Sequence, residues 1–311
     1  MIALVTQLSD AENQAWLALF KEQMPAEEIV IFSQMNNEQR LACDIAIIAN
    51  PLLEHLESLP NLVWVHSLWA GVESLVKAVE KMKLTLVRLI DPMLSQTMAE
   101  AALAWTLYLH RDMPKYAKQQ SQKIWHQIEY TEPKDRHISI LGLGALDQEA
   151  AKVLSAQGFK VSGWSYSPKT LEGVDCYHGE EGLQTMLTNT HILICLLPLT
   201  DMTSGLINRE FIAHLPDGAQ LINFARGGIV NSTDLFAALD AGKLDHAVLD
   251  VFEQEPLTCD SEYWQHEKIT VLPHISAQTN PVSASKIVAK NIDKYRQQGI
   301  IPDGVDMGKG Y

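Results

Sequence analysis

The chain has few cysteines and no long apolar run, and each absence excludes a class of protein. The cysteines, Cys43, Cys176, Cys195 and Cys259, are scattered without a CxxC pair, so we expect neither a zinc site nor a disulfide framework. No stretch approaches the roughly 20 apolar residues of a transmembrane helix, and the amino terminus lacks the basic leader of a secretory signal. The sequence therefore predicts a cytoplasmic protein with no membrane partner and no metal.

Positive charge is also scarce. The chain has 24 lysine and arginine residues against 38 aspartate and glutamate residues, a net charge of −14. This acidic surplus argues against nucleic acid or an anionic membrane as the main partner. The length of 311 residues, of which 47% are hydrophobic and 20% charged, suits two globular domains. Local positive groups would have to hold any anionic ligand, and Arg88, Arg226 and helix N-termini are the candidates.

Two series of short apolar segments alternate with helical stretches, which predicts βαβ units and mostly parallel sheets. The first series predicts strands at 3–6, 29–32, 45–49 and 63–66. A helix-compatible stretch at 94–127 comes next, and its length and period predict a long buried helix. The second series predicts strands at 138–141, 160–164, 191–196, 219–224, 246–249 and 269–272, and a last helix at about 281–298.

These series predict an α/β fold with two doubly wound parallel-sheet domains, Rossmann-like or flavodoxin-like, and an active site in the cleft between them. The last helix would return the chain to the first domain. Residues 1–95 and 284–311 would then form a discontinuous substrate domain, and residues 96–283 a dinucleotide-binding domain.

A glycine loop opens the second series. Gly142 and Gly144 follow a predicted strand and precede a predicted helix. The first glycine permits a tight turn, and the second lets the backbone approach a pyrophosphate at the helix N-terminus. Asp147 stands where the usual third glycine would be. Its side chain should push the helix away from the strand and place a charge near the phosphate, unless the residue serves as a helix cap.

The end of the next strand indicates which nicotinamide cofactor is used. Enzymes that prefer NAD place an acidic residue about 20 residues after the glycines, where it bonds the ribose 2′-hydroxyl. Here the segment offers Ser165, Ser167 and Lys169 instead, which are suited to a 2′-phosphate. NADP(H) is therefore the preferred cofactor and NAD(H) the second choice. A serine-rich turn with a solvated lysine is the simpler alternative.

Three polar residues, Arg226, Asp250 and His274, follow three apolar strands of the second series. Because ligands bind beyond the carboxyl ends of parallel strands, we expect these side chains to converge on one crevice. A fixed cation, a proton carrier and a group that tunes the carrier are what reduction of a 2-oxo acid requires. Taken singly, Arg226 could be a surface residue on a turn, and Asp250 and His274 could cap their strands.

Longer segments carry a resemblance to a known family. They lie at 215–219, 223–227, 249–252, 255–257, 273–274, 305–306 and 310–311. In these segments the chain resembles the D-isomer-specific 2-hydroxyacid dehydrogenases, and most of all their glyoxylate/hydroxypyruvate reductase A branch. The resemblance covers nearly the whole chain, although it is dense only from 196 to 274 and thin over the first sixty residues.

The resemblance implies a role for each polar residue. Arg226 would bond the carboxylate and ketone oxygens of a 2-oxo acid, and His274 would protonate the carbonyl oxygen as hydride arrives. Glu255 would orient the imidazole and favour its charged form, although it could be an ordinary loop acid. Backbone N–H groups of the loop Ala70, Gly71 and Val72 would hold the substrate carboxylate. The expected cofactor-binding residues are Met98, Gly142, Gly144, Ala145, Leu146, Ser165, Ser167, Lys169, Leu197, Pro198, Ala225 and Asp250.

The predicted function is that of an oxidoreductase that reduces a small 2-oxo acid, such as glyoxylate or hydroxypyruvate, to the D-2-hydroxy acid with NADPH. Arg88 would assist a second polar group of the substrate or form a structural ion pair.

Residues 49–51 lack the aromatic side chain that the branch usually places in its pocket, so a reductase for a bulkier acid is an alternative. A weakly catalytic NAD(P)-binding sensor or corepressor is another, indicated by Asp147. The resemblance also implies a homodimer formed through the helix around 98–109.

Overall fold

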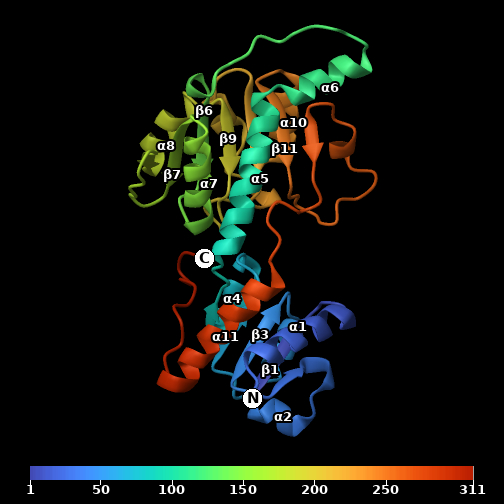
Figure 1. Cartoon of the computed structure of the whole chain (residues 1–311), viewed down its shortest axis with the longest axis vertical. Helices are drawn as coiled ribbons and strands as arrows, with labels where there is room; N and C mark the ends of the chain where they lie inside the picture. Colours follow the sequence, from blue (N-terminus) through green and yellow to red (C-terminus); the bar gives the residue numbers. More distant parts are fainter. Residues whose placement is uncertain (311) are drawn as a thin grey trace. The chain divides into compact units, whose positions relative to one another are not determined.

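Each half of the chain is built on one sheet of parallel strands (Figure 1). The computed structural model describes residues 1–310, so Tyr311, which contributes to the family resemblance, lies outside the described residues. One compact unit consists of Met1–Met93 and the chain from Thr279 onward, and the other of Leu94–Gln278. Both boundaries fall a few residues before those that the sequence suggested.

The sheet of the first unit has the strand order β2-β1-β3-β4-β5. Its elements, in chain order, are β1 (Ile2–Thr6), α1 (Asp10–Gln23), β2 (Ile29–Ile31), η1 (Phe32–Gln34), α2 (Asn37–Ala42), β3 (Ile45–Ala49), α3 (Leu53–Glu57), β4 (Trp64–Ser67), α4 (Glu73–Lys81), β5 (Thr85–Val87) and, from the end of the chain, α11 (Pro281–Gln298). The last helix therefore belongs to the first unit, and this unit is discontinuous in sequence.

Helices cover both faces of this sheet, which explains why β3 is apolar at every position and wholly buried. On one face, Trp16 and Phe20 of α1 and Ile292 of α11 pack against the strands. On the other face, Val76 and Val79 of α4 do the same.

The sheet of the second unit has the order β12-β11-β10-β9-β6-β7-β8. Its elements are α5 (Pro92–His110), α6 (Met113–Ser121), η2 (Pro133–Asp135), β6 (His137–Leu141), α7 (Ala145–Ala156), β7 (Lys160–Ser165), β8 (Asp175–His178), α8 (Gly179–Leu187), β9 (Ile192–Cys195), α9 (Arg209–Ala213), β10 (Ala219–Asn223), η3 (Gly227–Ile229), α10 (Ser232–Asp240), β11 (Leu244–Leu249), η4 (Glu262–Trp264) and β12 (Ile269–Val271). Helices α5 and α7 pack on one face, and α8, α9 and α10 pack on the other.

Three elements differ from the sequence-based expectation. The structure contains two strands that the sequence did not predict, β5 and β8. Strand β5 is only three residues long, and β8 is a partly exposed strand at the sheet edge without an apolar run. The long helix expected over 94–127 is wrong beyond His110. Asp112 adopts a left-handed backbone (φ 54°), α6 then runs with no buried residue, and residues 122–132 are not helical. No helix within residues 1–310 has the length and apolar character that crossing a membrane requires.

Candidate active site

The predicted polar residues lie at the carboxyl ends of adjacent strands in the second unit. Strands β6, β9, β10, β11 and β12 are neighbours and run parallel. Gly142 follows β6, and Arg226, Asp250 and His274 come within three residues of the ends of β10, β11 and β12. Since parallel strands end at the same edge of a sheet, these groups share one edge.

The imidazole of His274 is held by Glu255. The His274 Nδ1 atom lies 2.7 Å from Glu255 Oε2, and the other carboxylate oxygen, Oε1, accepts a 2.9 Å hydrogen bond from the Phe252 N–H. The carboxylate is thus fixed at both oxygens and in turn orients the ring. The His274 side chain remains 53% exposed, so its second nitrogen, Nε2, can meet a ligand. This pair can carry a proton to or from a bound molecule.

The backbone at His274 is held in an uncommon conformation by Asp250. His274 has a left-handed φ of 54°, which few residues other than glycine adopt. Its N–H donates to the Asp250 carbonyl (3.0 Å), and the Asp250 carboxylate accepts from the Ile275 N–H (2.7 Å) and the Ser276 N–H (2.8 Å). Asp250 is 1% exposed, and in this arrangement its side chain braces the loop that presents the histidine.

The turn that carries Arg226 is fixed by its neighbours. The buried Asn223 side chain accepts from the Ala225 N–H (3.1 Å) and donates to the Arg226 carbonyl (3.1 Å). A Cβ atom on Gly227 would lie 1.9 Å from the Phe252 carbonyl carbon, so only glycine allows this approach of the two loops. The half-buried Arg226 guanidinium donates through its NH1 atom to the Ala225 carbonyl (2.6 Å).

Asn223 and Gly227 therefore contribute to the site although the sequence reasoning gave them no role. The signal for Asn223 was a polar residue at the end of a strand, directly after the apolar Leu221 and Ile222. For Gly227 the sequence could show only a flexible pair with Gly228, since the contact that requires glycine comes from residue 252.

The glycine loop has the geometry of a phosphate-binding turn, with one addition. Gly142 has φ +117°, its N–H donates to the Trp164 carbonyl (2.9 Å), and Gly144 is the N-terminal cap residue of α7. The Asp147 side chain folds back over the loop, and its Oδ2 atom accepts from the Gly144 N–H at 2.7 Å. Asp147 is thus a helix cap, which the sequence offered as one of two interpretations.

The segment after β7 places a cation on the same loop. Lys169 Nζ donates to the Leu143 carbonyl (2.7 Å), which also accepts from the Gln148 side chain (3.0 Å). The Ser165 hydroxyl donates to the Ser167 carbonyl (2.8 Å) and is buried, whereas Ser167 is exposed. Lys169 and Ser167 are therefore suited to a phosphate, whereas Ser165 shapes its own turn.

The remaining expected cofactor residues are distributed over four elements of this unit. Ala145 and Leu146 open α7, Ala225 is buried beside Arg226, and Met98 is buried on α5. Leu197 and Pro198 come after β9, where Leu197 is 8% exposed.

The expected substrate residues other than Arg226 belong to the first unit. Ala70, Gly71 and Val72 form the turn between β4 and α4, and Arg88 comes after β5. The turn is braced by the Ser67 hydroxyl, which accepts from the Trp69 N–H (3.0 Å). Ala49, in the segment 49–51 where the resemblance implies an aromatic side chain, is fully buried in the core of this unit.

Two further histidines of the second unit, His191 and His246, have structural roles. His191 Nδ1 accepts from the His137 N–H (2.9 Å), and His246 Nε2 lies 2.9 Å from the Thr270 hydroxyl on the neighbouring strand. Burial lowers the pKa of His191, and it lowers the pKa of His246 to about 4. Neither ring is placed to exchange protons with a ligand near neutral pH.

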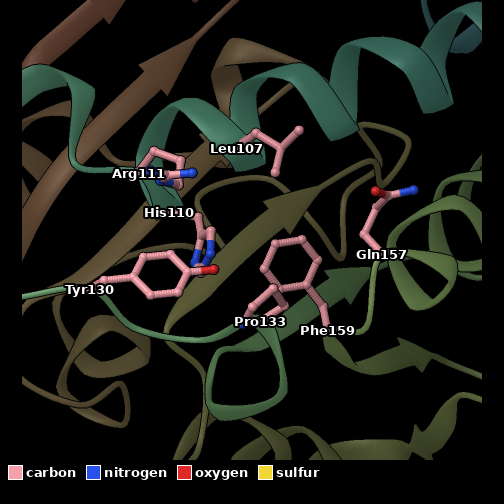
Figure 2. A pocket seen from close by; sticks show the side chains of 7 residues that line it. All are labelled: Leu107, His110, Arg111, Tyr130, Pro133, Gln157 and Phe159. Atoms are coloured by element: carbon pink, nitrogen blue, oxygen red, sulfur yellow. The ribbon is translucent and has the colours of Figure 1, made fainter.

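A hollow of about 230 Å³ lies elsewhere in the second unit (Figure 2). Its lining residues are Leu107, His110, Arg111, Tyr130, Pro133, Gln157 and Phe159. Pro133 and Phe159 precede β6 and β7, so the hollow lies toward the amino ends of these strands, away from the candidate active site. Within residues 1–310, no cluster of three or more histidine, cysteine, aspartate or glutamate side chains could hold a metal ion.

The chain is similar to known proteins over most of its length. Residues 103–276 match the family model described as D-isomer specific 2-hydroxyacid dehydrogenase, NAD binding domain. The chain belongs to the D-isomer-specific 2-hydroxyacid dehydrogenase family. A solved member from Xanthobacter autotrophicus Py2, in complex with NADPH and MES, is 34% identical, with a TM-score of 0.93 over 100% of this chain and 99% of that one.

Two further solved structures are similar over the whole chain. The NADPH-dependent glyoxylate/hydroxypyruvate reductase from Sinorhizobium meliloti, in complex with NADP and sulfate, is 30% identical with a TM-score of 0.91. A probable 2-hydroxyacid dehydrogenase from Rhizobium etli CFN 42, in complex with NADP, HEPES and L(+)-tartaric acid, is 27% identical with a TM-score of 0.90. Each covers 100% of this chain and 99% of its own. Family membership confirms the two-sheet α/β fold and identifies the chain as an NAD(P)-dependent dehydrogenase.

Proposed function

We propose that this dehydrogenase reduces a small 2-oxo acid of the glyoxylate or hydroxypyruvate type to the D-2-hydroxy acid. NADPH is the preferred cofactor and NADH the second choice. The observation that carries the proposal is the 2.7 Å contact between His274 and Glu255, which lies at the same sheet edge as Arg226. The relative from S. meliloti, whose name states this activity, supports the choice of substrate class.

Arg226 binds and polarises the substrate in this proposal. Its planar guanidinium can donate two parallel hydrogen bonds, which suits the carboxylate and ketone oxygens of a 2-oxo acid. The turn fixed by Asn223 and Gly227 limits the positions that the guanidinium can reach. A fixed cation is also a favourable partner for the negative charge that develops on the ketone oxygen.

His274 supplies the proton. With Nδ1 engaged by Glu255, the Nε2–H of the protonated ring donates to the ketone oxygen during reduction, and neutral Nε2 accepts the proton in the reverse direction. Glu255 orients the ring and stabilises its positive charge. Asp250, through its bonds to residues 275 and 276, positions the histidine.

The backbone of the glycine loop fits a dinucleotide. Gly142 and Gly144 carry no side chain at the N-terminus of α7, where backbone N–H groups and the helix dipole favour a pyrophosphate, although the Asp147 carboxylate lies in the space beside them. When bound, the nicotinamide cofactor supplies the hydride. Lys169 and Ser167 would bond a 2′-phosphate, while Met98, Ala145, Leu146, Ser165, Leu197, Pro198, Ala225 and Asp250 would complete the cofactor-binding set.

The first unit contributes the substrate-binding loop in this proposal. The backbone N–H groups of Gly71 and Val72 would hold the substrate carboxylate, with Ala70 shaping the turn, and Arg88 would bond a second polar group. The roles of the loop residues are inferred from the family resemblance, and that of Arg88 from its place after β5. Mutation of Arg88 tests the role of that residue.

A homodimer formed through α5 and the segment after it is part of the proposal. This region exposes large apolar side chains that water solvates poorly, namely Leu107, Met113, Tyr116, Ile124 and Trp125. Trp125 is 99% exposed. A second copy of the chain would cover this surface.

A reductase assay tests the proposal directly. Purified protein is mixed with NADPH or NADH and with glyoxylate, hydroxypyruvate, pyruvate or the bulky phenylpyruvate, and the absorbance of the reduced cofactor is followed. We expect the highest kcat/KM with NADPH as cofactor and with glyoxylate or hydroxypyruvate as substrate. A chiral product should have the D configuration. A preference for phenylpyruvate would favour the bulky-substrate alternative, and no oxidation with any acid would contradict reductase activity.

A further inference from the structure

The N-terminus of α7 already holds a carboxylate from its own chain. Asp147 lies in the first turn of this helix and is 6% exposed. Its Oδ2 atom accepts the Gly144 N–H at 2.7 Å. This N–H is one of the backbone donors that an α-helix leaves without an internal partner, and such donors bind the phosphates of dinucleotides.

The same carboxylate occupies the space that the glycines leave. A Cβ atom built on Gly142 would lie 2.4 Å from Asp147 Oδ2, and one built on Gly144 would lie 3.3 Å from it. Glycine is favoured at the first position because it permits the tight turn, and at the second because its lack of a side chain lets a pyrophosphate approach the backbone. In this chain the approach is obstructed by a negatively charged group.

We propose that Asp147 is an internal competitor of the cofactor pyrophosphate and thereby sets the affinity for dinucleotides. The inference rests on the proposed use of a nicotinamide cofactor. To bind the pyrophosphate at the Gly144 N–H, the protein must move the carboxylate away; if the carboxylate stays, the two negative groups repel each other at short range. Either way, cofactor affinity is lower than the glycine loop alone would provide.

The competition concerns a part of the cofactor that NADPH and NADH share. Replacing Asp147 should therefore change the affinity for both cofactors by the same factor. Lys169 differs, because it is proposed to meet the 2′-phosphate that only NADPH carries. The ratio of the two affinities separates the contributions of these residues.

The test measures cofactor affinity by titration calorimetry, with no substrate and no turnover. Asp147→Asn removes the charge but keeps an oxygen that can accept the Gly144 N–H. Asp147→Gly removes the whole side chain. We expect Asp147→Asn to lower the Kd for NADPH and for NADH about tenfold, and the difference from the native protein to shrink at high salt, which screens charges.

Glu149→Gln is the matched control, because it removes one carboxylate from the same helix. The Glu149 Oε2 atom lies 3.6 Å from Lys152 Nζ on the protein surface. This variant should leave both Kd values unchanged. Thermal unfolding of each variant shows whether the hydrogen bond between the Gly144 N–H and the Asp147 carboxylate contributes to stability. If Asp147→Gly folds poorly, Asp147→Asn still tests the inference.

Unchanged Kd values for a folded Asp147→Asn variant would overturn the inference, and weaker binding would do so too, since it would show that the cap organises the loop for the cofactor. A gain confined to NADPH would also contradict it. If neither the native protein nor any variant binds either dinucleotide, the proposed cofactor use itself fails, and the inference with it.

Discussion

The two units share an architecture but differ in the residues that come directly after their strands. In the second unit, Arg226, Asp250 and His274 each lie within three residues of the carboxyl end of a strand. In the first unit, as far as it is described, the corresponding positions after β1, β2, β3 and β4 carry no charged residue, and β5 alone is succeeded by one, Arg88. The same architecture therefore carries different side chains at its strand ends in the two units, and in the proposed function the chemistry depends on those strand ends rather than on the sheet.

The largest effect that tests this comparison is expected at His274. Asparagine is the suitable replacement because it tolerates the left-handed backbone found there. His274→Asn removes the proposed proton donor, and kcat should fall by about 10²–10⁴ while the Kd for NADPH is retained. Steady-state kinetics and cofactor titration measure the two quantities. His214→Asn, at an exposed histidine of the same unit, is the control and should have no effect.

The first unit should respond differently. Arg88→Ala is expected to raise KM for hydroxypyruvate by about tenfold and to change kcat little, because it removes binding that is equal in ground and transition states. If Arg88→Ala lowered kcat as strongly as His274→Asn does, the assignment of chemistry to the second unit alone would be wrong.

A second, smaller contrast concerns pH. Each unit buries one neutral histidine on a strand, His66 in β4 and His246 in β11, and burial lowers the pKa of each from 6.5 to about 4. His66 Nδ1 lies 2.8 Å from the Ser67 carbonyl, and its Nε2 lies 2.9 Å from the Asn291 side-chain nitrogen. Both rings are therefore held in the uncharged form in the folded protein.

The sign of the pH effect is set by the direction of these pKa shifts. Between pH 6.5 and about 4, the unfolded chain takes up protons that the folded protein does not, so stability is complete above that range and is lost as the pH falls through it. Each histidine can contribute up to about 3 kcal/mol to this loss. Urea unfolding at several pH values should show that the free energy of unfolding depends less steeply on pH in His66→Gln, a variant of the first unit, and in His246→Gln, a variant of the second. If the free energy of unfolding of both variants depended on pH as steeply as that of the native protein, these histidines would not be the cause of the loss of stability at low pH.

The sequence predicted the parts of the site that depend on strand ends. Apolar strands with a polar residue after them are visible as a pattern, which is why Arg226, Asp250 and His274 could be placed on one edge. The last helix was predicted with its observed limits, Pro281–Gln298, because proline marks its start and glycine comes after its end. Strand β8 was missed because a partly exposed edge strand needs no apolar run.

Tertiary contacts account for what the sequence could not provide. That Asp250 bonds the backbone of residues 275 and 276, and that Gly227 lies against Phe252, depends on how neighbouring loops fold together. The sequence likewise left two interpretations of Asp147 open. Only the observed bond to the Gly144 N–H decides that the side chain folds back as a cap.

The smallest predicted effect again compares the units, through two buried histidines with opposite surroundings. His66 has a partner for both ring nitrogens, whereas both nitrogens of His110, a residue that is 3% exposed, are buried without a hydrogen-bond partner among residues 1–310 (Figure 2). The His110 ring contacts Phe159 edge to face at 4.9 Å between centroids, so a phenyl ring in its place keeps this packing.

His110→Phe should therefore stabilise the protein by about 1 kcal/mol, because it removes two polar atoms that burial leaves unbonded. The matched change His66→Phe should destabilise it by about 1–3 kcal/mol, because the Ser67 carbonyl and the Asn291 amide would lose their partner. Urea unfolding at neutral pH measures both. If His110→Phe is destabilising as well, water in the hollow bonds the His110 ring, and the contrast between the two histidines disappears.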